Sequence, residues 1–113
     1  MAIAVKQLAR GALTSAQDLY TTPINKTAIV KSIRLVNTTS AAVTVNLYLR
    51  RGSSGTQYRI GPVSMSLPAN SLYVDETEIT LEGGATAGTT DDRIYGSASD
   101  TVHFVLSGIE RDA

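Results

Sequence analysis

The strongest structural signal in the chain is an alternating stretch at residues 43–50, Val43-Thr44-Val45-Asn46-Leu47-Tyr48-Leu49-Arg50. Its odd positions are apolar, whereas its even positions carry a hydroxyl, an amide, a phenol and a guanidinium group. Neighbouring side chains of a β-strand point to opposite faces of the sheet. The stretch therefore predicts a strand with one buried face and one face in water.

A second apolar stretch, residues 28–37, precedes the first. In an extended strand, Ile29, Ile33 and Leu35 share one face, and Lys31 interrupts that face, which places this end near a rim. The polar segment between the two stretches is typical of a turn. We therefore expect the two strands to form an antiparallel hairpin with a longer loop.

Turn-forming residues recur along the rest of the chain at roughly ten-residue intervals. Pro62 lies in an otherwise strand-like run and indicates a sheet edge or a bulge. Further strands are expected at residues 19–21, 57–60, 72–75, 78–81, 92–96 and 102–109, with residues 3–8 as a first strand or an extended arm. About eight short strands with this spacing predict an all-β fold, a single antiparallel β-sandwich of the jelly-roll or immunoglobulin-like type.

The length of 113 residues suits one domain with one hydrophobic core. We expect residues 1–18 to form an N-terminal strand or arm and residues 19–113 to form the β-sandwich domain. Two interpretations fit the apolar residues of the first segment: a first strand of the same domain, or a strand added to the open sheet edge of a neighbouring subunit.

The composition argues against several classes of function. Ten Lys and Arg residues balance ten Asp and Glu residues, so the formal net charge is +0. Nucleic acids and anionic membranes attract proteins with a basic excess, and we expect neither as a partner. Cysteine is absent, which excludes disulfides and thiolate chemistry. The first residues lack a basic start followed by an apolar block, so we expect no signal peptide.

The sequence offers few groups that could catalyse a reaction. His103 is the single histidine, and its place between Val102 and Phe104 favours a half-exposed strand residue over a general base or a metal ligand. The acidic segment 75–78 has fewer converging oxygen atoms than a Ca²⁺ site needs, which favours a solvated edge. No nucleophile elbow, P-loop or dinucleotide-binding motif occurs. We expect no enzymatic activity and no cofactor.

Tyrosine dominates the aromatic residues, with five Tyr, one Phe and no Trp. A tyrosine side chain buries apolar area while its hydroxyl stays in water, which suits protein interfaces. Arg50 and Arg51 can bind phosphate or a partner's carboxylate, or form ion pairs with acids of the same surface. Ordinary sheet surface is the alternative interpretation of the tyrosines. The candidate interface consists of Tyr48, Arg50, Arg51, Tyr58, Tyr73 and Tyr95.

Several short motifs occur in a recognisable order. Leu19-Tyr20-Thr21-Thr22-Pro23 leads into residues 26–33, then into Leu35-Val36-Asn37-Thr38-Thr39 and the alternating strand, and residues 92–99 read Asp-Arg-Ile-Tyr-Gly-Ser-Ala-Ser. In this order the chain resembles, over roughly residues 5–110, small β-sandwich proteins encoded among the structural genes of tailed bacteriophages. The resemblance implies a virion component of the head surface or the tail, and it carries no catalytic motif.

This resemblance leads to a functional hypothesis. We expect a head decoration or cement protein, made in the host cytoplasm, that binds the major capsid protein or other virion proteins and stabilises the shell. Self-association as a homotrimer is expected because capsid lattices offer three-fold positions. The alternative is a tail- or fibre-associated adhesion module that binds a host glycan or protein. A groove where tyrosine and carboxylates converge, near residues 51–58 and 83–92, would indicate that alternative.

Overall fold

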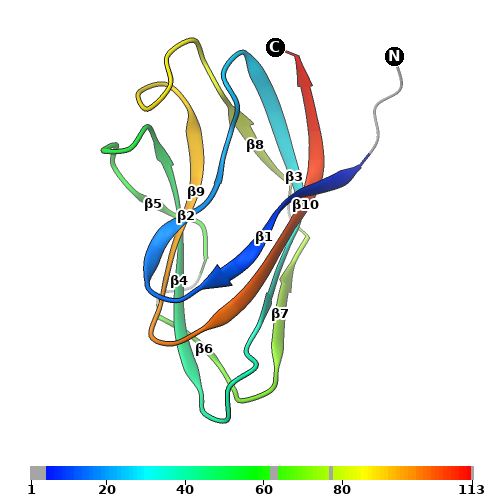
Figure 1. The fold of residues 1–113 in the computed structure, drawn as a ribbon, viewed down its shortest axis with the longest axis vertical. Helices are drawn as coiled ribbons and strands as arrows, with labels where there is room; N and C mark the ends of the chain where they lie inside the picture. The colour runs from blue at the N-terminus through cyan, green and yellow to red at the C-terminus, as the bar shows by residue number, and fades with distance from the viewer. Residues whose placement is uncertain (1–4, 62–63, 77, 113) are drawn as a thin grey trace.

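A computed structural model describes residues 5–61, 64–76 and 78–112 and arranges them in two antiparallel sheets (Figure 1). Sheet A contains β1 (Lys6–Leu13), β10 (Val102–Asp112), β3 (Lys26–Val36), β7 (Leu72–Asp75) and β8 (Ile79–Glu82). Sheet B contains β2 (Ala16–Thr21), β9 (Asp92–Ala98), β4 (Val43–Arg51), β5 (Tyr58–Arg59) and β6 (Met65–Leu67). The described residues contain no helix that could cross a membrane. The predicted all-β sandwich is confirmed.

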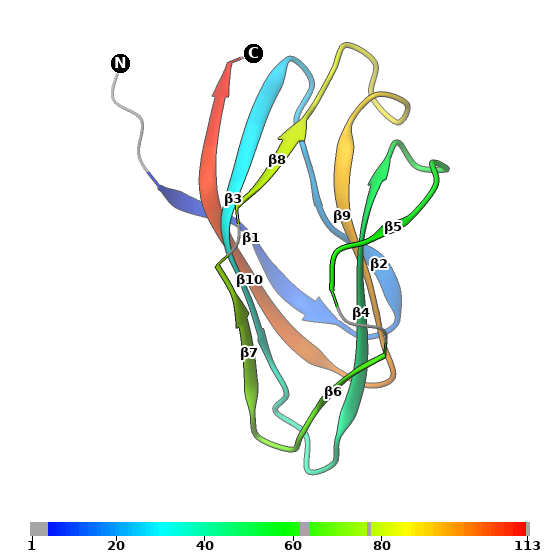
Figure 2. The ribbon, with the colours of Figure 1, turned by 180° about the vertical axis from the view of Figure 1, so that it is seen from behind.

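The order of the strands identifies the sandwich as a jelly roll. Sheet A has the order β1-β10-β3-β7, with β8 also on β3, and sheet B has the order β2-β9-β4-β5, with β6 also on β4. Four of the pairings are those of one long folded hairpin: β1 with β10, β2 with β9, β3 with β7 and β8, and β4 with β5 and β6. Two further pairs, β10–β3 and β9–β4, wind this hairpin into two layers. Figures 1 and 2 show the layers from opposite sides.

The core lies between the two sheets and follows the alternation of the sequence. Val43, Val45 and Leu47 of β4 are buried, as predicted, and Leu49 packs against the core from its margin. Phe104 and Leu106 of β10 face them from sheet A. Burial of these aliphatic and aromatic side chains is the main source of stability in such a sandwich.

The predicted hairpin between residues 28–37 and 43–50 is wrong, because β3 lies in sheet A and β4 in sheet B. Both edges of β3 are occupied, by β10 on one side and by β7 and β8 on the other. The connection instead crosses between the layers, and the buried Asn37 holds it there. Its side-chain amide donates to the carbonyl oxygens of Ala41 (2.9 Å), Leu67 (2.9 Å) and Pro68 (3.1 Å).

The predicted common face of Ile29, Ile33 and Leu35 is also wrong. Ser107 pairs with Ser32 and Gly108 pairs with Val30, so Lys31 is an extra residue in β3. Such a β-bulge reverses the alternation of the strand. Ala28 and Val30 are buried before it, Ile33 and Leu35 after it, and Ile29 faces outward. Gly108 is required at this bulge, because a Cβ atom there would lie 2.0 Å from the Ile29 carbonyl oxygen.

Most other strand predictions agree with the structure within a few residues. Residues 72–75 form β7 as expected, β9 extends to Ala98, and β10 extends to Asp112. Strand β6 was not predicted from the sequence. The first strand, β1, begins at Lys6 and pairs with β10. After β1, Thr14 and Ser15 connect to β2 in the other sheet. The expectation for Pro62 falls outside the described residues, as do the first residues of the predicted arm.

A polar contact joins the two sheets at the end where β10 terminates. The Tyr20 hydroxyl of β2 donates to Glu110 of β10, which also accepts a hydrogen bond from the Lys6 ammonium group (2.8 Å). Burial, followed by the hydrogen bond and charge of Glu110, raises the pKa of Tyr20 far above its ordinary value. Burial alone would raise the pKa of Glu110, but the hydrogen bonds from Lys6 and Tyr20 outweigh burial and lower it.

Replacing Glu110 should make stability less dependent on acid pH. Because its folded-state pKa lies below the ordinary 4.5, Glu110 stabilises the fold above that pH, and the contribution disappears as the pH falls through the folded pKa. Glu110→Gln should lower the free energy of unfolding by about 1 kcal/mol at pH 7, and by less at pH 3 than at pH 7 because part of this contribution is lost below pH 4.5. Chemical denaturation at both pH values tests this. The exposed Glu82→Gln serves as the control, and an equal deficit for Glu110→Gln at both pH values would contradict the assignment.

Removing the Asn37 side chain should destabilise the crossing between the layers. Asn37→Ala leaves the carbonyl oxygens of Leu67 and Pro68 without their donor, and each buried unpaired group costs roughly 1–3 kcal/mol. We expect a loss of about 3 kcal/mol in unfolding free energy, measured by urea titration. Ser40→Ala, an exposed change in the same connection, should be near neutral. Similar values for the two variants would argue against the proposed role of Asn37.

Candidate functional site

The outer face of sheet B brings three of the predicted interface residues together. Tyr48 of β4 lies opposite Tyr95 of β9, and their ring centroids are 6.2 Å apart. The Arg50 guanidinium lies over the Tyr95 ring at 4.3 Å, and Arg59 of β5 lies over the Tyr48 ring at 4.9 Å. Arginine stacked on an aromatic ring is a favourable cation–π arrangement. The even positions of β4 thus build a layered aromatic and cationic surface.

A network of ion pairs lies beside this surface. Arg50 and Arg93 are opposite each other on β4 and β9, and Asp18 of β2 accepts a hydrogen bond from each, at 3.1 and 2.8 Å. Arg93 also donates to the buried Asp91 at 3.2 Å. Burial would lower the pKa of Arg93, but its hydrogen bonds to Asp18 and Asp91 outweigh burial and raise it. Within this network two arginines and two aspartates neutralise one another, whereas the exposed Arg59 on the same face bonds only the neutral Asn46 and Tyr48.

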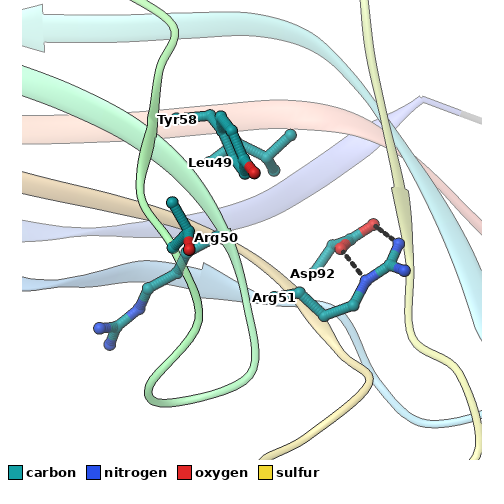
Figure 3. A pocket seen from close by; sticks show the side chains of 6 residues that line it. Leu49, Arg50, Arg51, Tyr58 and Asp92 are labelled. Atoms are coloured by element: carbon teal, nitrogen blue, oxygen red, sulfur yellow. Dashed lines mark hydrogen bonds and ion pairs between the residues drawn. The ribbon is translucent and has the colours of Figure 1, made fainter.

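Next to the network lies a hollow of ≈ 400 Å³ between β4, β5 and β9 (Figure 3). Leu49 and Tyr58 form its apolar lining, and the Tyr58 side chain is largely exposed. Arg51 donates from Nε to Asp92 at 2.9 Å and keeps 61% of its side chain exposed. Figure 3 shows the Arg50 guanidinium directed away from Asp92. An exposed ring beside an exposed guanidinium, which the buried Asp92 orients, suits a ligand with one flat face and several hydroxyl groups.

Two loops meet beside this hollow. The backbone amides of Gly52 and Ser53 donate to the carbonyl oxygens of Asp91 (2.8 Å) and Gly88 (3.0 Å). Gly52 has a φ of 71° and lies so close to the other loop that a Cβ atom would be 2.7 Å from the Gly88 oxygen. Residues 51–58 and 83–92 therefore lie together, in the place where the sequence analysis looked for a groove. Tyrosine and carboxylate converge there as Tyr58 and Asp92.

The remaining predicted residues lie elsewhere. Tyr73 is on β7 of sheet A, packs against the core and donates to Asp75 at 3.4 Å, and burial raises its pKa. His103 is exposed on the outward face of β10. Glu78 pairs with Lys31. Among residues 5–61, 64–76 and 78–112, no three His, Asp or Glu side chains gather where they could hold a metal ion.

Sequence reasoning missed a second surface, the outer face of sheet A. The side chains of Leu72 and Val74 remain 52% and 39% exposed there, whereas Tyr73 and Asp75 between them turn inward. Val36 of β3 pairs with Leu72 and points to the same outer face. Val105 of β10 also points to this face, in the row of Val74 and Arg34. The alternation of residues 72–75 shows that Leu72 and Val74 share a face, but nothing in the sequence says that this face is the exposed one.

Comparisons with known proteins find likeness in structure alone. No protein-family model and no curated protein matches the chain. A structure of infectious bursal disease virus, Gt strain, matches 97% of this chain with a TM-score of 0.48 and 9% identity. A structure of the Gx strain of that virus matches 99% of this chain with a TM-score of 0.43 and 13% identity. The chain covers 33% and 38% of those two chains, about a third of their length.

Loss of the shared acid should weaken the ion-pair network. Asp18→Asn removes the charge between Arg50 and Arg93, whose side chains are only 14% exposed. Partly buried pairs stabilise more than exposed ones, so we expect a loss of roughly 2 kcal/mol in unfolding free energy. Asp112→Asn, which breaks the exposed pair with Lys26, is the matched control and should change stability little. Equal effects in urea titrations would show that burial does not strengthen the network.

Proposed function

We propose that this protein is a non-enzymatic structural component of a virion, a head decoration protein that binds the capsid surface and stabilises the shell. The resemblance to small β-sandwich proteins of tailed bacteriophages supports this function. A jelly roll also suits it physically, because its two sheets present broad and rigid faces on a packed core. Such a protein acts by adding buried interface area between capsid subunits.

The observation that carries the proposal is the exposed aliphatic surface of sheet A. Leu72 and Val74 are exposed side by side with the outward Val36 and Val105. Contiguous apolar surface on a soluble protein marks an interaction site more often than scattered apolar residues do. A flat sheet face of this kind matches an extended protein surface better than it matches a small molecule.

We further propose that the protein is a homotrimer on the head. Closed cyclic symmetry suits the three-fold positions of a capsid lattice. Three linked copies would also raise the avidity for a repetitive surface without new contacts in each copy. The formal net charge of +0 gives only weak repulsion between copies.

The hollow beside Tyr58 favours a second candidate function, an adhesion module that binds a host glycan. A sugar ring could stack on Tyr58, and its hydroxyl groups could bond the exposed guanidinium of Arg51, which Asp92 holds in place. The hollow lies on sheet B, on the other layer from the aliphatic surface. A virion component attached through sheet A would leave it open.

Binding to assembled particles separates the two functions. The purified protein, mixed with heads assembled without it, should co-sediment with them and raise the temperature at which they release DNA. Host cells serve as the second target. Binding to cells but not to heads, abolished by Tyr58→Ala, would contradict the decoration function and establish adhesion. Analytical ultracentrifugation of the free protein and counting of copies per head test the trimer.

A further inference from the structure

Two rows of side chains cross the outer face of sheet A from β7 to β1. The strand register places Leu72, Val36, His103 and Ala12 in one row, and Val74, Arg34, Val105 and Arg10 in the next. These outward positions follow from the burial of their neighbours Ile33, Leu35, Phe104 and Leu106. We call Leu72, Val36, Val74, Val105, Arg34 and Arg10 the sheet A patch.

The charges of the sheet A patch are of one sign. Arg34 and Arg10 are both exposed, and among the described residues neither makes an ion pair or a side-chain hydrogen bond. The two rows contain no carboxylate. On sheet B, in contrast, Asp18 and Asp91 neutralise Arg50 and Arg93. Arg10 and Arg34 therefore place positive charge without an acidic partner next to the exposed aliphatic side chains of sheet A.

A second copy of the chain is a poor occupant for the patch. Two patches packed face to face would bury four guanidinium groups without an anion between them. Burying a charge without a counter-charge is strongly unfavourable. The complement that fits is a protein surface that places carboxylates around aliphatic side chains. Guanidinium groups bind such carboxylates in a two-pronged geometry that fixes orientation as well as affinity.

We infer that the sheet A patch docks an acidic, aliphatic protein surface, which, resting on the proposed decoration function, belongs to the capsid. Val74 and Val105 lie on either side of Arg34 in the same row. A partner's carboxylate that pairs with Arg34 is therefore flanked by apolar side chains. Water is excluded around such a pair, which strengthens it. The outer face of sheet B, with Tyr48, Tyr95 and Arg50, then faces away from the shell.

Charge reversal in the patch tests this inference. Arg34→Glu, and independently Arg10→Glu, should weaken co-sedimentation with heads at least tenfold, because each places a carboxylate against the partner's carboxylates. Both residues are exposed on strands, so the fold should persist, and circular dichroism checks it. Arg111→Glu makes the same charge change on β10, about 20 Å from the row of Arg34 at the usual strand rise, and is the matched control. It should bind nearly as well as the wild type.

Each other outcome has a defined meaning. Wild-type protein that leaves the heads bare overturns the decoration function and this inference with it. If the wild type binds heads and both Arg34→Glu and Arg10→Glu still bind them, the inference is overturned and the decoration function stands. Equal losses for Arg34→Glu and Arg111→Glu would indicate attraction by net charge, and would also overturn it. Dissociation of a wild-type oligomer by Arg34→Glu, with head binding unchanged, would assign the patch to a second copy instead.

Discussion

The antiparallel ladder between β3 and β10 holds the rolled chain closed. It pairs Val36 with His103 at one end and Lys26 with Asp112 at the other, so that segments distant in sequence form the centre of sheet A. Without it, sheet A would separate into the β1–β10 pair and the group of β3, β7 and β8. Phe104 and Leu35, which are buried on its inner side, would then lose their cover. Forming such a distant pairing requires the closure of a long loop, which makes it a slow step in folding.

The sequence predicted where strands lie better than it predicted which strands pair. The alternation along residues 43–50 predicts that the odd-numbered side chains are buried, and the structure confirms it for Val43, Val45 and Leu47. A polar loop, however, looks the same whether it closes a hairpin or crosses between layers. Asn37 decides between the two, through carbonyl oxygens of Leu67 and Pro68 that lie far along the chain. Lys31 was visible as an interruption, but its meaning as a bulge depends on its partner strand.

The same distinction applies to the candidate site. Tyr48 and Arg50 share the outward face of β4, as alternation predicts, and register adds Tyr95 from β9. Asp18 and Arg93 were missed because their roles depend on neighbouring strands rather than on any local motif. Tyr73 lies apart from the other tyrosines, since β7 belongs to the opposite sheet. On sheet A, outward aliphatic residues resemble core positions in sequence, and only the fold shows that nothing within the described residues covers Leu72 and Val74.

The outermost position of each sheet, opposite β1 and β2, is occupied by two short strands instead of one long strand. β7 and β8 divide the edge of β3 at the Lys31 bulge, and β5 and β6 divide the edge of β4. Each fragment offers too few consecutive free amides and carbonyls to act as a template for a foreign strand. The division thereby protects the sandwich from fibrillar aggregation along this side, while its broad faces stay open.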